Sequence, residues 1–367
     1  MRYELSLLYM GSALMDDPIL RGSLRRQAEA RGWCVVAERR LPRMEPDTPL
    51  ELQRELERPG HYLIVADEET FALAGRILAT LAERPLLLSA TGLLAPDNAR
   101  EVTETSFTLE LEAATVTLLR RDDDAPYPPL PLPEPGSKAW QCFPLDEREE
   151  RELLRRLGIL GEERVAFQRR LPGWLHLRAC GEESVAQMEE LLHSHIARII
   201  PRTSLVRAFI DYFTHAGKTL TFAESCTGGR LAAAITAESG SSAILEGSYV
   251  TYANRIKAGW LGVENSTLEE HGAVSAQCVR EMARGAQRNL EADIAVAISG
   301  IAGPTGAVPG KPVGTVYLCV RNGDRERVLR LQLGGDRNAV QEQAVLHALK
   351  MVLESEEKIF EFFSKNP

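Results

Sequence analysis

A proline-rich stretch divides this chain. Arg121 is followed by three aspartates and then by a dense run of prolines from Pro126 to Pro135. Proline has no backbone N–H and a fixed φ angle, so a run of this density joins neither a helix nor the interior of a sheet. The sequence therefore predicts an extended linker over residues 121–138. A chain of 367 residues is expected to form roughly two or three domains, and this linker marks one boundary.

The first segment, residues 1–120, alternates short apolar runs with amphipathic ones. Strands are expected at residues 5–10, 33–36, 62–65, 85–88 and 115–119, and helices at residues 20–31 and 71–84. This alternation predicts a three-layer α/β domain. Asp67, Glu68 and Glu69 follow the third strand and offer carboxylates to a metal, but acidic residues are also common at a helix start, where they favour the helix dipole.

Residues 139–200 predict a small α+β domain of strand, helix, strand, strand and helix, ferredoxin-like or KH-like in order. A KH domain that binds nucleic acid needs a Gly-x-x-Gly loop between helices, and this segment lacks one. A spacer or oligomerisation module is the better interpretation. Pro201 then marks the start of a third domain, an α/β/α unit over residues 201–367 that ends in one long helix at residues 338–363.

Composition narrows the function classes. The net charge of −9 disfavours a general nucleic-acid binder, because an acidic surface repels a polyanion. Six cysteines are scattered without paired spacing, as is typical of reduced, buried thiols, and the close pair His193 and His195 lacks further ligands. We expect no metal and no cofactor. The sequence has no signal-peptide pattern and no apolar run long enough for a bilayer, so a cytoplasmic protein without membrane contact is expected.

The chemistry concentrates in the third domain. Ser225 lies between a strand-like run at residues 218–222 and a helical run at residues 230–237, and two glycines follow it at positions 228 and 229. A serine at such a turn lies beside the free N–H groups of a helix start, where glycines allow a ligand close to the backbone. Ser225 is therefore a candidate nucleophile. The alternative is that Ser225 and Thr227 are ordinary helix caps.

Three further groups follow predicted strands. Asn254 is a good N-cap and places Lys257 in the first helical turn, where the helix dipole and burial lower the pKa of an amine; a solvated surface lysine is the alternative. The loop from Ser299 to Gly306 offers backbone N–H groups to a phosphate or an oxyanion, although glycine-rich turns also serve packing. Arg337 precedes the last helix and can bind an anion or pair with a local carboxylate.

Taken together, these motifs closely resemble the C-terminal domain of the CinA (competence/damage-inducible) family. They occur in order between about Ser204 and Leu353 and read Ala-Glu-Ser-Cys-Thr-Gly-Gly (223–229), Tyr-x-Asn-x-x-Lys (252–257), His-Gly-Ala-Val-Ser (271–275), Ser-Gly-Ile-Ala-Gly-Pro-Thr-Gly (299–306), Lys-Pro-Val-Gly-Thr-Val (311–316) and Gly-Asp-Arg (335–337). The family often has serine at the position of Ala253 and glutamate at that of Arg255. These two departures leave the reacting residues intact but change the local charge.

The resemblance implies a nicotinamide-nucleotide amidase, which hydrolyses nicotinamide mononucleotide to nicotinate mononucleotide and ammonia. Its nucleophile falls on Ser225, with Lys257 and Tyr252 as the catalytic lysine and tyrosine, and the N–H groups near Gly228 and Gly229 are expected to hold the oxyanion. The residues expected to contact the substrate are Thr227, Gly228, Gly229, Asn254, Ser299, Gly300, Gly303, Gly306 and Arg337. A homodimer is expected, because the long terminal helix and the first domain offer surfaces for assembly.

The first domain resembles the molybdopterin-binding-type domain of full-length family members, some of which are associated with ADP-ribose pyrophosphatase activity. The positions of that domain's glycine-rich loop and metal-binding carboxylates hold other residues here, at 11–15 and 65–70. An inactive, architectural domain is expected. Two other functions remain open for the chain: a scaffold or sensor that binds a pyridine nucleotide or an ADP-ribose-like ligand without turnover, and a phosphohydrolase, against which the lack of a carboxylate cluster counts.

Overall fold

The computed structural model describes residues 4–11, 14–41, 47–121, 130–131, 137–143, 146–160, 165–180, 182–195 and 198–366. The chain divides into two compact units, residues 1–138 with 156–166 and 178–191, and residues 139–155 with 167–177 and 192–367. Most of the expected linker lies outside the described residues, so the domain bounds stay a prediction. Ser137 and Lys138, at the end of the proline-rich stretch, belong to a strand, β8 (Ser137–Cys142).

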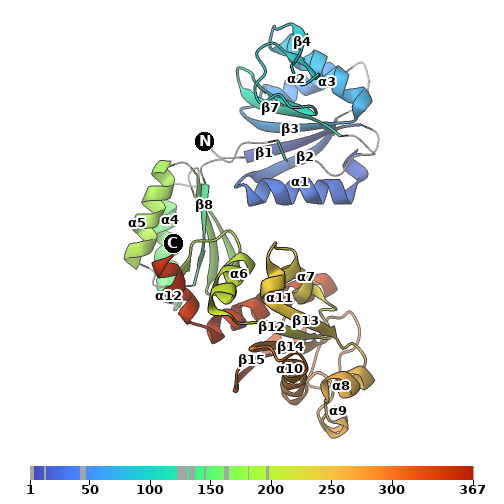
Figure 1. Cartoon of the computed structure of the whole chain (residues 1–367), viewed down its shortest axis with the longest axis vertical. Helices are drawn as coiled ribbons and strands as arrows, with labels where there is room; N and C mark the ends of the chain where they lie inside the picture. The colour runs from blue at the N-terminus through green and yellow to red at the C-terminus, as the bar shows by residue number, and fades with distance from the viewer. Residues whose placement is uncertain are drawn as a thin grey trace. The chain divides into compact units, whose positions relative to one another are not determined.

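The first segment forms a five-stranded sheet with the order β2-β1-β3-β7-β6. Its strands are β1 (Glu4–Met10), β2 (Cys34–Leu41), β3 (Gly60–Ala66), β6 (Ser106–Glu110) and β7 (Ala114–Arg120). Only β6 runs antiparallel to its neighbour. Helix α1 (Pro18–Ala30) packs on one face, and α2 (Thr48–Leu56) and α3 (Glu68–Leu81) pack on the other (Figure 1). The two faces have separate apolar cores, and α2 and α3 share one of them. The predicted three-layer α/β arrangement is confirmed.

Short elements of this segment escaped the sequence analysis. Helix α2, the 3₁₀ turn η1 (Leu14–Asp16) and strands β5 (Leu94–Pro96) and β6 were not predicted, and β4 (Leu86–Leu88) pairs with β5 outside the main sheet. The 3₁₀ turn and the strands have three to five residues, too few apolar positions for a period to be recognised, and α2, with nine residues, spans only about two and a half turns. The carboxylate of Asp67 serves as the N-cap of α3 and accepts the Thr70 N–H at 2.9 Å.

The middle segment forms a four-stranded sheet with the order β11-β8-β10-β9. Its elements after β8 are α4 (Glu147–Leu160), β9 (Val165–Leu171), β10 (Trp174–Cys180), α5 (Glu182–His195) and β11 (Ile199–Ile200). The predicted α+β order is confirmed, and the two-residue strand β11 extends it.

The C-terminal segment forms a second five-stranded sheet with the order β13-β12-β14-β15-β16. Its strands are β12 (Leu220–Glu224), β13 (Leu245–Val250), β14 (Ile294–Gly300), β15 (Thr315–Asn322) and β16 (Arg325–Gln332). Its helices are α6 (Leu205–Ala216), α7 (Arg230–Thr236), the 3₁₀ turn η2 (Ser241–Ala243), α8 (Asn254–Leu261), α9 (Asn265–Glu270), α10 (Ala276–Leu290), α11 (Arg337–Ser355) and α12 (Lys358–Lys365). β12, β13 and β14 are parallel, so their carboxyl ends share one edge of the sheet.

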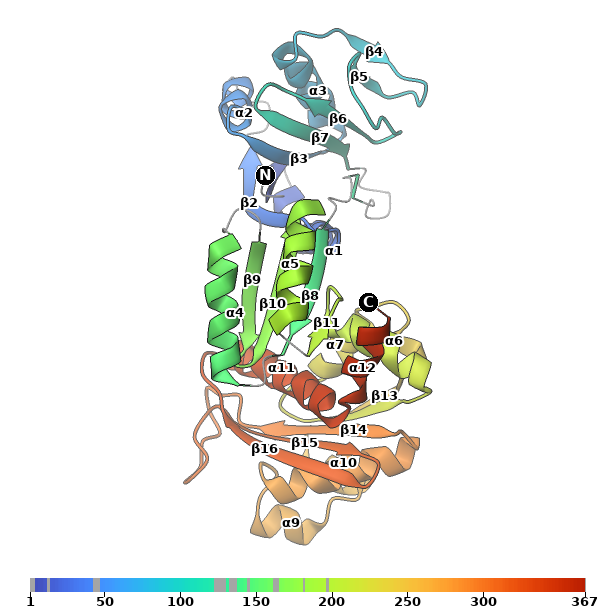
Figure 2. The same ribbon diagram turned by 90° about the vertical axis from the view of Figure 1, so that its left-hand side faces the viewer.

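Alternate residues of β14 enter two different cores. Ile294, Val296 and Ile298 pack with α6, α7 and α11 on one face, whereas Ala295 and Ala297 pack with α10 on the other. Large residues therefore face one helical layer, and alanines allow α10 to lie close on the other side. Figure 2 shows α10 and α11 on opposite sides of this sheet. The predicted α/β/α architecture is confirmed.

The expectation of one terminal helix is wrong, because α11 ends at Ser355 and α12 begins at Lys358. Glu356 leaves the helical conformation, with φ −137° and ψ 63°. Its buried carboxylate accepts hydrogen bonds from Tyr212, Lys218 and Asn322, partners that a sequence pattern does not reveal. Among the residues that the structure describes, no helix is both long and apolar enough to cross a membrane.

Candidate active site

Ser225 directly follows β12 at the carboxyl edge of the parallel strands. Its N–H donates to the carbonyl of Ile298 in β14 at 2.9 Å, which ties the turn to the centre of the sheet. The residue is only 9% exposed. The turn is thus a fixed part of the domain, and it holds its serine hydroxyl where α/β folds assemble sites.

Lys257 extends from α8 to this serine and is 1% exposed, so the alternative interpretation, a solvated surface lysine, is wrong. Its Nζ lies 2.9 Å from Ser225 Oγ, 2.6 Å from the carbonyl oxygen of Thr251 and 3.1 Å from that of Tyr252. Burial lowers the pKa of the amine, and the thiols of Cys278 and Cys226 oppose the shift. No carboxylate pairs with Lys257 in the described part of the chain, so the ammonium form lacks a counter-ion.

These three contacts fit either protonation state of Lys257: an ammonium would donate one N–H group to each oxygen, whereas a neutral amine has one N–H group fewer. A neutral amine has two N–H groups and one lone pair, and the two carbonyl oxygens take the two N–H groups. The lone pair is then left for the third neighbour, the hydroxyl of Ser225. An amine in this state is what a serine nucleophile needs as a general base.

Helix α8 begins one residue earlier than the sequence suggested. Its N-cap is Ala253, whose side chain makes no capping hydrogen bond. Asn254 is the first residue of the helix, and its side chain is exposed. Lys257 therefore occupies the fourth helical position, where the helix dipole acts less strongly. Burial, rather than the helix start, is the leading cause of its lowered pKa. The side chain of Arg255 is also exposed, so this departure from the family pattern leaves the Lys257 contacts unchanged.

Neither Ser225 nor Thr227 caps helix α7. Its N-cap is Gly229, and Glu224, the last residue of β12, supplies the acceptors instead, binding the N–H groups of Gly229, Leu231 and Ala232 at 3.0–3.1 Å. The cap interpretation is therefore wrong. The expected oxyanion donors are also occupied, because the Gly228 N–H donates to Ser225 O at 3.2 Å and the Gly229 N–H to Glu224.

Tyr252 and Arg337 meet at the rim of the site. The Tyr252 ring is 61% exposed, and its hydroxyl accepts a hydrogen bond from Arg337 Nη2 at 2.9 Å. Arg337 Nη1 donates to the carbonyl of Gly303 at 2.8 Å. The guanidinium of Arg337 thus links its own segment to Tyr252 and to the loop from Ser299 to Gly306. Tyr252 reaches Lys257 through its backbone carbonyl, while its phenol contacts the arginine.

The other predicted residues are distributed around this centre. Ser299 is buried and donates its hydroxyl to the carbonyl of Ala273 at 2.7 Å. A Cβ at Gly300 would lie 2.9 Å from the Thr315 carbonyl oxygen and one at Gly303 2.5 Å from the Val313 side chain, so both glycines serve packing. Gly306 is exposed at the tip of the loop. Thr227 is buried, and its hydroxyl has no hydrogen-bond partner among the described residues.

Two functional neighbours escaped the sequence analysis. Glu224 was quoted only as part of a motif, although a lone acidic residue in an apolar strand is a signal for a buried, bonded carboxylate. Gln341 of α11 donates from Nε2 to the carbonyl of Cys226 at 2.6 Å and carries no local signal, because only the fold brings α11 to the turn. Within the described residues, no group of three or more His, Cys, Asp or Glu side chains could hold a metal ion.

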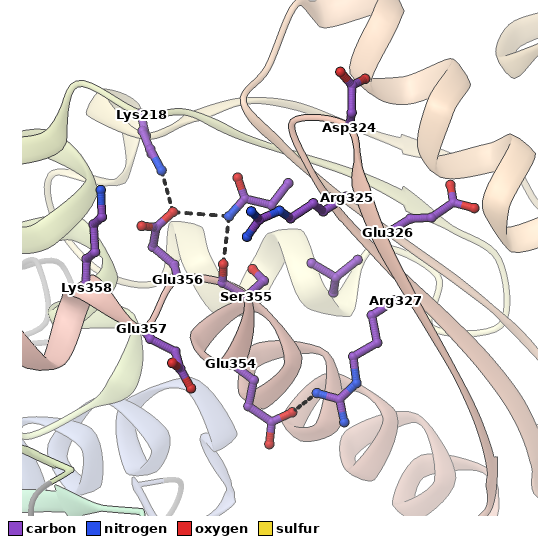
Figure 3. Close-up of a pocket in the computed structure, with 12 residues that line it drawn as sticks. Lys218, Asp324, Arg325, Glu326, Arg327, Glu354, Ser355, Glu356, Glu357 and Lys358 are labelled. Atoms are coloured by element: carbon purple, nitrogen blue, oxygen red, sulfur yellow. Dashed lines mark hydrogen bonds and ion pairs between the residues drawn. The ribbon is translucent and has the colours of Figure 1, made fainter.

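One pocket of this domain lies elsewhere. It has a volume of about 690 Å³, lies where Lys218 precedes β12, and is lined by side chains of both signs, including Glu354, Glu356 and Arg327 (Figure 3). None of the predicted site residues lines it.

The fold and the site define an α/β/α domain with a buried serine–lysine pair at the carboxyl edge of its parallel strands. The sequence profile of the CinA C-terminal domain matches residues 202–355. The chain is 46% identical over 154 residues to the nicotinamide-nucleotide amidohydrolase PncC of Pseudomonas putida, which covers 42% of this chain and 96% of that protein. The PncC of Escherichia coli K12 is 50% identical over 135 residues, or 36% of this chain and 82% of that protein. The chain belongs to the CinA family.

Other relatives are longer than the shared region. The CinA-like protein of Thermotoga neapolitana is 47% identical over 133 residues, which is 36% of this chain but only 32% of that protein. Among solved structures, the competence damage-inducible protein A of Klebsiella pneumoniae is 39% identical, with 41% of this chain and 93% of that chain covered and a TM-score of 0.40.

Proposed function

We propose that the C-terminal domain is a nicotinamide-nucleotide amidase that hydrolyses nicotinamide mononucleotide to nicotinate mononucleotide and ammonia. The observation that carries the proposal is the buried contact of 2.9 Å between Lys257 Nζ and Ser225 Oγ. The substrate is inferred from the names of the PncC relatives, which match this domain at 46–50% identity.

The reaction begins with attack of Ser225 Oγ on the carboxamide carbon, while its proton moves to the neutral Lys257. The tetrahedral intermediate collapses as the lysine returns this proton to the leaving amine, which departs as ammonia. Water then attacks the acyl-enzyme, again with Lys257 as base, and releases nicotinate mononucleotide. Positioned proton transfer of this kind contributes about 10² to 10⁴ in rate.

Arg337 is suited to hold the phosphate of the substrate. Its guanidinium has five N–H groups, and the contacts to Gly303 and Tyr252 leave others free to bind phosphate oxygens. The phenol of Tyr252 fixes the guanidinium, and the backbone carbonyl of Tyr252 orients Lys257. The loop from Ser299 to Gly306 would line the same side of the substrate.

The test is ammonia release from nicotinamide mononucleotide by purified protein, with and without a chelator. Ser225→Ala should abolish release while the thermal unfolding transition persists, and the chelator should have no effect. Ser242→Ala, at an exposed serine of η2, is the control and should retain full activity. Undiminished activity of Ser225→Ala would refute the assignment, and nucleotide binding without ammonia in either form would favour a sensor.

We infer that the first domain has no pyrophosphatase activity. The Asp67 carboxylate is already bound to the N–H and hydroxyl of Thr70, and Glu68 and Glu69 have exposed side chains at the start of α3. Full-length Ser225→Ala protein, incubated with ADP-ribose and Mg²⁺ or Mn²⁺, should release no AMP above a protein-free blank. Metal-dependent AMP formation would contradict this inference.

A further inference from the structure

Glu224 is a fully buried carboxylate beside the candidate nucleophile. Its Oε2 accepts the N–H groups of Gly229 and Leu231, and its Oε1 accepts the N–H of Ala232 at 3.0 Å and the Ser248 hydroxyl at 3.3 Å. No lysine or arginine among the described residues forms an ion pair with it. The negative charge is therefore stabilised by backbone N–H groups at the positive end of α7.

This carboxylate closes the nucleophile turn. Glu224 directly precedes Ser225, yet it binds the first turn of α7, so the four residues between Ser225 and α7 must form a tight loop. Within that loop the N–H of Gly228 donates to Ser225 O, and the N–H of Ser225 donates to Ile298 O. The N-terminus of α7 is thus filled by Glu224 and is closed to an external anion.

Two N–H groups of the turn donate to no oxygen acceptor in the described structure. They belong to Cys226 and Thr227, which are 4% and 1% exposed. The Cys226 N–H lies beside its own thiol, a weak acceptor, and the Thr227 carbonyl accepts the Arg230 N–H at 3.2 Å. Gln341 binds the carbonyl of Cys226 at 2.6 Å, and in a trans peptide the next N–H, that of Thr227, points to the opposite side. The Thr227 hydroxyl is also buried and unpaired. Buried donors are rarely left unpaired, and in native structures such exceptions occur at catalytic positions.

We propose that Glu224 is a positioning residue whose carboxylate holds the turn so that the N–H groups of Cys226 and Thr227 form the oxyanion hole of the reaction at Ser225. This proposal rests on the proposed amidase function for its substrate, although the hole itself would serve any tetrahedral intermediate formed on Ser225. Gln341 supports the same geometry from α11. The N–H group of the residue after a nucleophile is a common oxyanion donor, and donors fixed before the reaction stabilise the developing charge most effectively.

The first test does not depend on the substrate. A fluorophosphonate probe reacts when Ser225 Oγ forms a bond to phosphorus, fluoride leaves, and the serine proton passes to Lys257; the charged phosphoryl oxygen then occupies the oxyanion hole. Glu224→Gln keeps the shape of the side chain but turns an NH₂ group toward backbone N–H donors. Labelling of Ser225, followed by mass spectrometry, should slow by about 10² in this variant, as for loss of an oxyanion donor.

Glu356→Gln is the matched control. Glu356 is also a buried carboxylate of this domain and binds Lys218, Tyr212 and Asn322. Figure 3 shows its contact with Lys218, which precedes β12, whereas Glu224 is the last residue of that strand. In Glu356→Gln protein, Ser225 should be labelled at the wild-type rate. If Glu224→Gln fails to fold, Gln341→Met provides the second test, because it removes the hydrogen bond to Cys226 O and should slow labelling by about tenfold.

The second test uses the amidase reaction. A thioamide analogue of nicotinamide mononucleotide develops its charge on sulfur, a weak hydrogen-bond acceptor. Glu224→Gln should lower kcat for the amide with little change in KM, and the amide-to-thioamide rate ratio should fall by about tenfold.

The outcomes separate the two proposals. If wild-type protein labels at Ser225 but releases no ammonia, the amidase function is wrong, and the labelling rates alone decide the role of Glu224. Wild-type labelling rates in Glu224→Gln, an unchanged amide-to-thioamide ratio, or equal losses in Glu224→Gln and Glu356→Gln would overturn the positioning role. Folded wild-type protein that neither labels at Ser225 nor releases ammonia would overturn both.

Discussion

Replacing Lys257 by methionine tests the central feature of the site. Methionine has a similar length but no proton to exchange, so Lys257→Met removes the base and keeps most of the packing. The structure predicts a loss of about 10² to 10⁴ in kcat/KM, the usual contribution of a positioned proton acceptor. It also predicts a change in the shape of the pH profile.

The magnitude follows from the protonation state. An ordinary lysine, with a pKa of about 10.4, is neutral in only about one molecule in a thousand near pH 7.4. Burial lowers the pKa of Lys257, and each unit of lowering raises the neutral fraction about tenfold and corresponds to about 1.4 kcal/mol. Because only the neutral amine acts as a base, kcat/KM should fall as the pH drops through the lowered pKa, with a slope of one.

The assay is the initial rate of nicotinate mononucleotide formation between pH 6 and 10.5, measured by chromatography of quenched samples. Wild-type protein should show an acid limb below the ordinary lysine pKa, and Lys257→Met should lose that limb. Lys350→Met is the control, since burial also lowers the pKa of Lys350, which donates to Pro172 O and lies outside the site. An acid limb near pH 10.4, or a limb that persists in Lys257→Met, would refute the reasoning.

Two further predictions concern binding and stability. Arg337→Met should raise KM for nicotinamide mononucleotide by about 10- to 100-fold, as expected for loss of a charged hydrogen bond, but should change KM for nicotinamide riboside little. Arg330→Met is the control and loses a contact to Gly310 O and a cation–π contact with Tyr317. Equal effects of Arg337→Met on both substrates would exclude a phosphate contact. Gly285→Ala should destabilise the domain by about 1–3 kcal/mol or more in thermal unfolding, because its Cβ would lie 1.9 Å from the carbonyl oxygen of Leu261. Gly259→Ala in α8 has open space around the new Cβ and should be neutral or stabilising by up to about 1 kcal/mol; a wild-type melting temperature for Gly285→Ala would contradict the close approach of α10 and α8.

Much of the C-terminal fold could be predicted because its elements are long and regular. Helix α6 is such an element, and Ser275 and Asp336, residue types that are favoured at N-caps, accept the Cys278 and Ala339 N–H groups at the starts of α10 and α11. Their signals are local, lying within one turn of the helix. By contrast, α2, β5 and β6 were missed, and α11 and α12 were merged. The proposed homodimer and the cytoplasmic location stay predictions.

The sequence alone determined which residue types follow the strands, and their order identified Ser225, Lys257 and Arg337 as one group. It did not determine how those residues are bonded. Whether Lys257 is buried, whether Glu224 or a serine holds α7, and which N–H groups stay unpaired depend on contacts between segments distant in sequence, such as Gln341 with Cys226 and Lys257 with Ser225. A local pattern fixes the direction and period of an element, but burial and hydrogen-bond partners are set only when elements pack. Tertiary structure therefore decided that the candidate base is buried, with a lowered pKa, and that the N–H groups of Gly228 and Gly229 are already bonded within the turn.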